Sequence, residues 1–482
     1  MPSFLAFLSG PRLYGLFHGP DRVETTLENA GNSALSFSSG IYYVVTSLAF
    51  SPMILFYMYT RGMVNPSSFM TILKYAGYLA VFSYGSRMVG RMMDDQYKQF
   101  LIIWTKANEG SKDDQKELKK YDFELTTVLP DYEATEGKTL WFLKPDVEEA
   151  GPITKALASF AINAFGRHMM YPGSLALLNY MMRQNLNQAR KLMVRNKGGE
   201  RIWIKNIEGD LVDAIFIRGE NPQYRDLLVI TCEGNAGYYE IGVANTPAQA
   251  GLSVLAWNQP GFGESSGLPF PKNTLSSADA VMQYATKVLK YPVEKIVLFG
   301  WSIGGFPVSW LAANYPNVRA VILDATFDDI LPLAESRMPR FVSPIVEYAI
   351  RKHANLQIDK IITKYDGPLR LIRRLQEEIL TTTEDVPENV RRASNRINFL
   401  LKAVLKERHP DLIKGMEPQV DRWLDMSETE RLMNTGVTLR EETQQRKRLF
   451  EACSHYLVDF DSNHVTPLDP LYFNIPDARK NF

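Results

Sequence analysis

The sequence predicts an α/β fold with a mostly parallel β-sheet. From residue 227 onward, short apolar strands alternate with helical segments, which is the order of repeated βαβ units. Ahead of them, residues 201–204 and 211–217 are typical of two strands joined by a tight turn at 208–210, which is a hairpin signal. A glycine-rich turn around Ser302 lies between a predicted strand and the helix that follows it, and it indicates which α/β fold is present.

The turn around Ser302 has the sequence of a nucleophile elbow. An apolar run at 296–299 leads into Gly300-Trp301-Ser302-Ile303-Gly304, and a helical segment follows. A serine in so tight a turn has a strained backbone, so the positions two before and two after it must be small. Strand, GxSxG and helix in this order indicate the α/β-hydrolase fold. A plain glycine-rich turn is the alternative, and the flanking strand and helix disfavour it.

The remaining segments fit this fold in order. Further strands are predicted at 227–232, 253–257, 320–324 and 369–373. The segment at about 325–367 lies between the last two strands, where this fold commonly inserts a lid. A helical insertion is expected at about 385–450, before His464 near the chain end. The hydrolase domain is therefore expected over 196–482.

Composition excludes several classes of function. Lys+Arg and Asp+Glu are balanced at 54 each in a chain of 482 residues, so nothing in the sequence indicates a nucleic-acid partner. Cys232 and Cys453 are the two cysteines. They form no disulfide framework and fit a reducing compartment. They also lack the spacing of metal ligands, and no HExxH motif occurs, so we expect no metal and no cofactor.

The first 100 residues contain two apolar runs. Residues 41–60 carry no charge and are long enough to cross a bilayer as one helix. Residues 69–84 form a second, shorter run. Small side chains in it would let two helices pack closely: Ala76, Gly77 and Ala80. We therefore expect 1–100 to be a membrane-associated segment with a hairpin. A pair of buried core helices is the alternative, and it stays open for the second run.

The charges beside these runs predict an orientation. Basic residues directly follow the second run, namely Arg87, Arg91 and Lys98, against Arg61 in the loop between the runs. The positive-inside bias therefore puts the catalytic part on the cytosolic side. Residues 101–195, which lead to the hydrolase domain, are expected to be a helical membrane-proximal region.

A serine nucleophile requires a base, and in this fold the order along the chain is nucleophile, acid, histidine. Four of the six histidines follow Ser302: His353, His409, His455 and His464. The first lies in the expected lid, the second in the inserted helices and the third in a helical stretch. His464 lies in a loop close to the chain end, where the base of this fold belongs. We therefore expect His464 to be the base.

The acid should follow the strand at 369–373. Glu377 has the usual spacing from the end of that strand, and Glu378 is one position further along. Asp324, at the end of the preceding strand, is the rival, because that position supplies the acid in some hydrolases. The order of preference is Glu377, then Asp324, then Glu378.

Two amides are needed to stabilise the oxyanion that forms during acyl transfer. The Ile303 amide lies directly after the nucleophile, at the start of the elbow helix. The second is expected from residues 233–237 (EGNAG), which follow a buried strand where lipases carry HGGG. Asn235 or Ala236 would be that donor.

Motifs spread over most of the chain are more specific than GxSxG: GPRLY at 10–14, MMYPGS at 169–174, CEGNAGYYE at 232–240, WNQPGF at 257–262, PFPKN at 269–273, WSIGGF at 301–306, ILDATFDD at 322–329, LIRR at 371–374, TTT at 381–383 and HVTPL at 464–468. The chain thus resembles the α/β-hydrolase domain-containing protein 16 family, the phosphatidylserine lipases. This resemblance implies an integral membrane lipase of the endoplasmic reticulum. Its implied reaction is hydrolysis of phosphatidylserine to lysophosphatidylserine, with activity on monoacylglycerols as well. One position departs, because Glu377 stands where the family's RR-x-x-DE pattern has an aspartate.

The expected mechanism is acyl transfer to Ser302, with His464 as general base and then general acid, oriented by Glu377. Water then releases a fatty acid from the lipid substrate. Two alternatives stay open. One is a neutral-lipid or acyl-thioester hydrolase, and the other is a catalytically inactive membrane scaffold that kept the fold.

Overall fold

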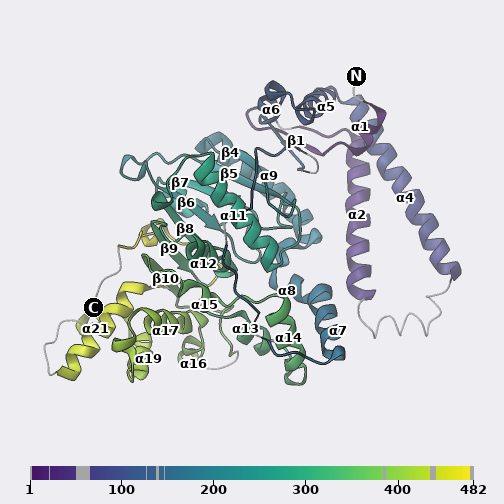
Figure 1. Ribbon diagram of the computed structural model, residues 1–482. Coiled ribbons are helices and arrows are strands. Elements are labelled where there is room, and N and C mark those ends of the chain that lie inside the picture. The colour runs from purple at the N-terminus through teal and green to yellow at the C-terminus, as the bar shows by residue number, and fades with distance from the viewer. Residues whose placement is uncertain are drawn as a thin grey trace.

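The computed structural model describes residues 3–477 apart from Asp21, 50–65, 126–127, 137–139, Asp146, 384–386 and 435–440. Within this described part, the central element is a nine-stranded sheet in the order β11-β10-β9-β8-β6-β7-β5-β4-β3 (Figure 1). Its strands are β3 (Tyr132–Glu133), β4 (Glu200–Lys205), β5 (Leu211–Ile217), β6 (Leu228–Cys232), β7 (Ser253–Trp257), β8 (Ile296–Trp301), β9 (Ala320–Asp324), β10 (Leu369–Arg374) and β11 (Leu457–Phe460). From β7 to β11 every neighbouring pair is parallel, whereas β5 is antiparallel to β4 and β7. The mostly parallel sheet and the β4–β5 hairpin agree with the sequence prediction.

Helices cover both faces of the sheet. Leu228 and Ile230 of β6 belong to the core cluster that contains α11 (Pro271–Lys287) and α12 (Gly305–Asn314). Val229 points to the opposite face, where α9 (Ala176–Lys197) and α10 (Asn245–Gln249) pack on the neighbouring strands. Because both faces are buried, the central strands are apolar at nearly every position rather than at alternate ones.

Two helical regions are inserted between the last three strands of the sheet. Between β9 and β10 lie α13 (Ile330–Ser336), α14 (Ser343–His353) and α15 (Ile358–Ile362). Between β10 and β11 lie α16 (Glu388–Ala393), α17 (Arg396–Arg408), α18 (Pro410–Ile413), α19 (Glu417–Asp425), α20 (Glu428–Asn434) and α21 (Glu441–Tyr456). The helices of this second region form the yellow-green to yellow group at the lower left of Figure 1. The edge strand β11, which the sequence analysis did not predict, follows α21 directly.

The amino-terminal region has a small core of its own. It contains α1 (Phe4–Ser9), the antiparallel pair β1 (Leu13–Leu16) and β2 (Tyr121–Phe123), α5 (Asp95–Asn108) and α6 (Lys112–Leu118). Aromatic side chains fill this core, including Tyr97, Phe100 and Phe123. Trp203 of β4 packs into it as well. The region is therefore joined to the sheet through a shared hydrophobic cluster.

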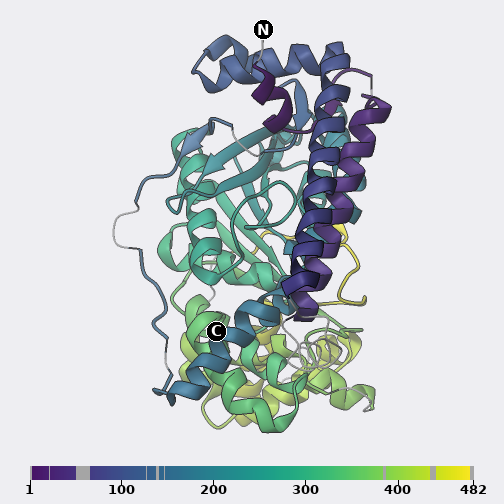
Figure 2. The same ribbon diagram turned by 90° about the vertical axis from the view of Figure 1, so that its right-hand side faces the viewer.

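The two long helices α2 (Thr26–Ala49) and α4 (Pro66–Met93) lie side by side and extend away from this core (Figures 1 and 2). They approach closely at two glycines. A Cβ on Gly31 would lie 2.5 Å from the Ser83 carbonyl oxygen, and one on Gly90 would lie 2.4 Å from the Glu28 nitrogen. The sequence analysis placed the close packing at Ala76, Gly77 and Ala80, but a Cβ on Gly77 would meet no described residue within 4 Å.

Among the described residues, no helix combines the length and the apolar character that crossing a membrane requires. The predicted span at 69–84 lies within α4, and it is shorter than the roughly 20 apolar residues that a bilayer needs. Residues 50–60 of the other predicted span lie outside the described residues. The structure therefore does not support the membrane hairpin. It does expose apolar side chains along α4, including Met70, Leu73, Tyr75, Tyr78, Val81 and Phe82.

Buried arginines tie the amino-terminal region to the hydrolase sheet. Arg201 of β4 donates to both carboxylate oxygens of Asp213, at 2.8 and 3.1 Å, and to Asp122 of β2 at 2.9 Å. Arg190 of α9 reaches the same Asp122 at 2.8 Å and Glu240 at 2.6 Å. All five side chains are almost fully buried, so each charge depends on its partners.

Replacement of Arg201 by Met is expected to destabilise the protein by about 3–5 kcal/mol, because it removes the buried cation that donates to both carboxylate oxygens of Asp213. Lys205→Met on the same strand is the matched control. Lys205 forms an exposed pair with Glu133, and we expect its loss to cost at most about 1 kcal/mol. Chemical unfolding of the detergent-solubilised proteins measures both values. Equal stabilities of the two variants would contradict the role given to the buried network.

Candidate active site

Ser302 lies in the turn that joins β8 to α12, as the sequence predicts. Its φ of 55° is in the left-handed region that L residues rarely adopt. A 3₁₀ turn over Ser302–Gly304 leads into α12. The hydroxyl of Thr326 donates to the Ser302 carbonyl oxygen at 2.7 Å and braces the turn from the end of β9. The strained elbow is therefore fixed by a side chain to which the sequence analysis assigned no role.

The two elbow glycines are required by close backbone contacts. A Cβ on Gly300 would lie 2.7 Å from the carbonyl oxygen of Gly304. A Cβ on Gly304 would lie 2.3 Å from the carbonyl oxygen of Cys232, at the end of β6. No side chain fits at these distances, so the turn can lie against the neighbouring strand only if both positions are glycine.

The structure brings His464 and Glu377 together. Nδ1 of His464 lies 2.8 and 3.0 Å from the two carboxylate oxygens of Glu377. A carboxylate can only accept, so Nδ1 carries the proton and Nε2 is left free to accept one. The backbone amides of Ile379 and Leu380 donate to the same carboxylate, at 2.8 and 3.0 Å, and hold it in place. His464 and Glu377 are 4% and 3% exposed.

Further contacts fix the loop that carries His464. The backbone amide of His464 donates to the Glu378 carboxylate at 3.0 Å. The ring of Trp301, next to the nucleophile, packs on the imidazole with 5.7 Å between centroids. Trp301 Nε1 also donates to the His464 carbonyl oxygen at 3.3 Å. No hydrogen bond joins the Ser302 hydroxyl to His464 in the described part of the chain, although Trp301 links the two residues.

Asp324, the rival acid, has another partner. Arg374 donates to its two carboxylate oxygens at 2.8 and 2.6 Å, and both side chains are buried. Burial raises the pKa of Asp324 and outweighs the opposing effect of Arg374. Arg374 also donates to the Ser462 hydroxyl and the Thr466 carbonyl oxygen, both at 2.7 Å. Asp324 therefore holds the His464 loop through Arg374, and no hydrogen bond joins its carboxylate to the imidazole among the described residues.

The expected oxyanion donors lie on two neighbouring strand ends. Ile303 follows Ser302, and residues 233–237 follow β6, whose Cys232 pairs with Gly300 of β8. Asn235 and Ile303 both line a cavity that Ser302 also lines. Ala236 is exposed and lies outside that lining. Of the two residues proposed for the second amide, Asn235 is therefore the better placed.

The loop with Asn235 is held by residues from several segments. The Gly173 amide donates to the Asn235 carbonyl oxygen at 3.0 Å, and the Tyr238 hydroxyl donates to the Gly173 carbonyl oxygen at 3.0 Å. The Glu233 carboxylate is fully buried and accepts from the amides of Val243 and Ala244 at 3.0 and 3.3 Å. Burial raises the pKa of Glu233 to about 8. The motif around Gly173 thus supports the oxyanion loop.

An apolar cavity of about 520 Å³ opens beside Ser302. Besides α13 and α14, it is lined by α7 (Pro152–Ala161), the π-helical turn Ile162–Gly166 and α8 (Arg167–Met170). The sequence analysis assigned no role to these last three elements. Their apolar spacing in PITKALASFAINAFG was the available signal. The lining includes Leu157, Phe160, Phe165, Met169, Leu333, Ile345 and Ile350.

Comparisons with known proteins identify the family of this chain. A family model described as the phosphatidylserine lipase ABHD16 N-terminal domain matches residues 2–124, and one for the alpha/beta hydrolase fold matches residues 227–462. The phosphatidylserine lipases ABHD16A of Bos taurus and Homo sapiens are each 31% identical to this chain, over 99% of it and 100% of their own length. The chain belongs to the ABHD16 family. The resemblance drawn from the motifs is thereby confirmed.

Membership in the ABHD16 family makes the chain a hydrolase of lipid or other carboxylic esters. A protein of Caenorhabditis elegans, named only as uncharacterized, is 64% identical over the full length of both chains. Among solved structures, an alpha-beta hydrolase from Vibrio vulnificus has 17% sequence identity and a TM-score of 0.36, and covers 50% of this chain and 81% of its own. No group of three or more potential metal-ligating side chains lies together in the described residues.

Isosteric changes at the three carboxylates separate their roles. Glu377→Gln is expected to lower turnover by about 10⁴-fold without unfolding the protein, because His464 loses its orienting charge. Glu378→Gln keeps an oxygen for the His464 amide and should be nearly normal. Asp324→Asn leaves Arg374 without its anion and should lower stability by about 3–5 kcal/mol.

Ester hydrolysis and thermal unfolding are measured on all three proteins. A fully stable but inactive Asp324→Asn protein, together with a normal Glu377→Gln protein, would place the acid at Asp324 instead.

Proposed function

We propose that this chain is a membrane-bound serine lipase that hydrolyses phosphatidylserine to lysophosphatidylserine and a fatty acid, and that it also acts on monoacylglycerols. The observation that carries the proposal is the apolar cavity that Ser302 lines, with the His464–Glu377 pair beside the same elbow. The substrate is that of the ABHD16A relatives, as their names state it.

In the proposed mechanism, Ser302 attacks the ester carbonyl while Nε2 of His464 takes the hydroxyl proton. Glu377 stabilises the imidazolium through the Nδ1 hydrogen bond. The amides of Ile303 and Asn235 donate to the oxyanion of the tetrahedral intermediate. His464 then returns the proton to the leaving alcohol, which is the lysophospholipid. Water then attacks the acyl-enzyme by the same steps and releases the fatty acid.

The apolar lining of the cavity supports an acyl chain as the group bound next to Ser302. Its lining is almost entirely apolar, so burial of each CH₂ of a fatty acyl chain contributes about 0.8 kcal/mol. Large apolar side chains beside the lining are exposed: Ile153 is 74% and Phe341 84% exposed. An apolar rim around a catalytic cavity suits a substrate that lies in a bilayer. Residues 325–367 would then be the lid over the acyl chain.

We propose further that the chain is held at the endoplasmic reticulum membrane by the region 1–100, with the catalytic part on the cytosolic side. The exposed apolar side chains of α4 support contact with lipid. The positions of Arg87, Arg91 and Lys98 in the sequence, directly after the second apolar run, support the cytosolic orientation of the catalytic part. A yeast relative that is 30% identical over 24% of this chain is named as a membrane protein.

Ser302→Ala is expected to abolish both labelling by a fluorophosphonate probe and release of fatty acid, with the unfolding temperature unchanged. His464→Ala should be equally inactive and the double variant no worse, because the groups act as one unit. A panel of phosphatidylserine, monoacylglycerol, triacylglycerol and acyl-thioester substrates identifies the preferred one. Substantial activity of pure Ser302→Ala protein would refute the mechanism, and failure of the probe to label the unmodified protein would favour an inactive scaffold.

Membrane attachment is tested on sealed microsomes. Extraction with alkaline carbonate is expected to leave the chain in the pellet, and added protease should digest the catalytic part from the cytosolic side. Release into the supernatant would show that the region 1–100 does not anchor the chain. Protection from protease without detergent would reverse the proposed orientation.

A further inference from the structure

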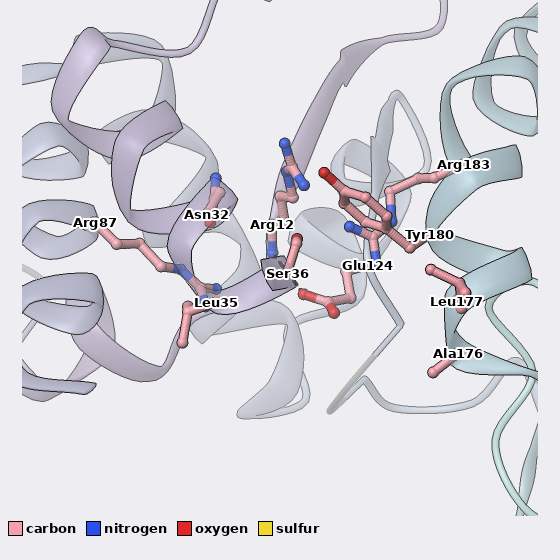
Figure 3. Close-up of a pocket in the computed structure, with 10 residues that line it drawn as sticks. All are labelled: Arg12, Asn32, Leu35, Ser36, Arg87, Glu124, Ala176, Leu177, Tyr180 and Arg183. Atoms are coloured by element: carbon pink, nitrogen blue, oxygen red, sulfur yellow. Dashed lines mark hydrogen bonds between the residues drawn. The ribbon is translucent and has the colours of Figure 1, made fainter. Parts of the chain in front are cut away.

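A second, polar cavity of about 220 Å³ lies away from the catalytic cavity and shares no lining residue with it. It lies between the amino-terminal region and α9, as Figure 3 shows. Asn32, Leu35 and Ser36 of α2 line one side together with Arg87 of α4. Tyr180 and Arg183 of α9 line the other, and Arg12 and Glu124 lie beside the β1–β2 pair. Three guanidinium groups therefore line one small space with a single carboxylate.

The charges of this cavity are not balanced within the described residues. Arg12 is neutralised, because its Nε lies 2.7 Å from the Glu24 carboxylate. The Glu124 carboxylate accepts from the backbone amide of Arg12 at 3.2 Å. Neither Arg87 nor Arg183 forms an ion pair with any described residue. Arg87 donates to the Gly10 carbonyl oxygen at 3.0 Å, and Arg183 lies over the Tyr180 ring at 5.7 Å.

An unused donor accompanies the excess positive charge. Arg87 Nε is buried and has no hydrogen-bond partner among the described residues. Buried polar groups in proteins normally have hydrogen-bond partners, and a group without one commonly marks a site for a water or an ion. In Figure 3 the side chains of Arg87 and Arg183 reach toward the cavity from opposite sides. A ligand between them would need several acceptor oxygens pointing in different directions.

We propose that this cavity binds a phosphate-type oxyanion, either free phosphate or the phosphomonoester of a lipid head group. Guanidinium groups match phosphate oxygens in charge and in the geometry of their hydrogen bonds. Arg87 supplies the unpaired Nε, Arg183 supplies a guanidinium that forms no ion pair with a described residue, and the Ser36 hydroxyl can donate as well. Leu35, Ala176 and Leu177 line the rest of the cavity, so a phosphate that carries an apolar group also fits.

The bound anion joins segments that are far apart in the sequence. Arg87 belongs to the amino-terminal region, and Arg183 belongs to α9. The helix α9 begins at Ala176, three residues after Gly173, whose amide holds the Asn235 loop. The anion should therefore stabilise the docking of the amino-terminal region without taking part in the chemistry at Ser302.

Thermal unfolding of the full chain in neutral detergent tests the site with inorganic phosphate, against sodium chloride of equal ionic strength. Phosphate should raise the unfolding temperature saturably. Arg183→Gln and Arg87→Gln should each weaken the apparent affinity by at least about tenfold, the value of one hydrogen bond to a charged group. Arg225→Gln is the matched control, because Arg225 is exposed and lines neither cavity. Each variant should hydrolyse a soluble short-chain ester at the rate of the unmodified protein.

Flotation with phosphatidylcholine vesicles, with and without phosphatidic acid, identifies the source of the anion. The background is Ser302→Ala, so that the lipid is not consumed. Weaker flotation after Arg183→Gln assigns the cavity to a lipid head group, and unchanged flotation with a retained phosphate effect assigns it to free phosphate. If a glutamine variant does not fold, Arg183→Lys replaces it and should bind phosphate more weakly than arginine does. The proposal is overturned if replacing Arg183 changes neither the stabilisation by phosphate nor the flotation with vesicles.

Discussion

The buried guanidinium of Arg374 determines how the catalytic end of the sheet is assembled. It bonds to Asp324 at the end of β9 and to the Ser462 hydroxyl and Thr466 carbonyl oxygen around His464. A buried charge is tolerated only when it is paired and its hydrogen bonds are made. The loop after β11 therefore has one favourable position relative to β9 and β10. His464 is positioned by an ion pair that takes no part in the chemistry.

The same interaction separates the roles of two carboxylates that the sequence leaves in competition. Asp324 and Glu377 are both buried; Asp324 ends β9, and Glu377 follows the parallel strand β10. Arg374 neutralises Asp324, while Glu377 receives two backbone amides and the imidazole. A longer side chain costs more entropy to order, and the two amides offset that cost by fixing the carboxylate. Glutamate can therefore occupy a position where the family pattern has aspartate.

The parts of the site that the sequence predicts are those set by local geometry. A strand, a turn with glycine on both sides of Ser302 and a helix are adjacent in the chain, so their spacing defines the elbow. Chain order and distance from a strand end are enough to select His464 and Glu377 as candidates. Thr326 and Arg374 are different, because their partners lie 24 and 50 residues away and depend on strand order. The strand β11 was missed because it has four residues and follows a helix without a turn.

The amino-terminal region shows why apolar length alone is a weak predictor of structure. Two apolar runs suggested a membrane hairpin packed at Ala76, Gly77 and Ala80, whereas the described parts of the helices approach closely at Gly31 and Gly90, beside buried charges. Glu28, next to one of these contacts, bonds to Arg91 at 3.0 Å and also pairs with Arg22. Such charges cannot lie in hydrocarbon without large cost, so this end of the helix pair belongs to the protein and not to a bilayer. The proposed contact with lipid therefore falls to the exposed apolar side chains of α4 between Met70 and Phe82, in a region that Asp122 binds to the sheet.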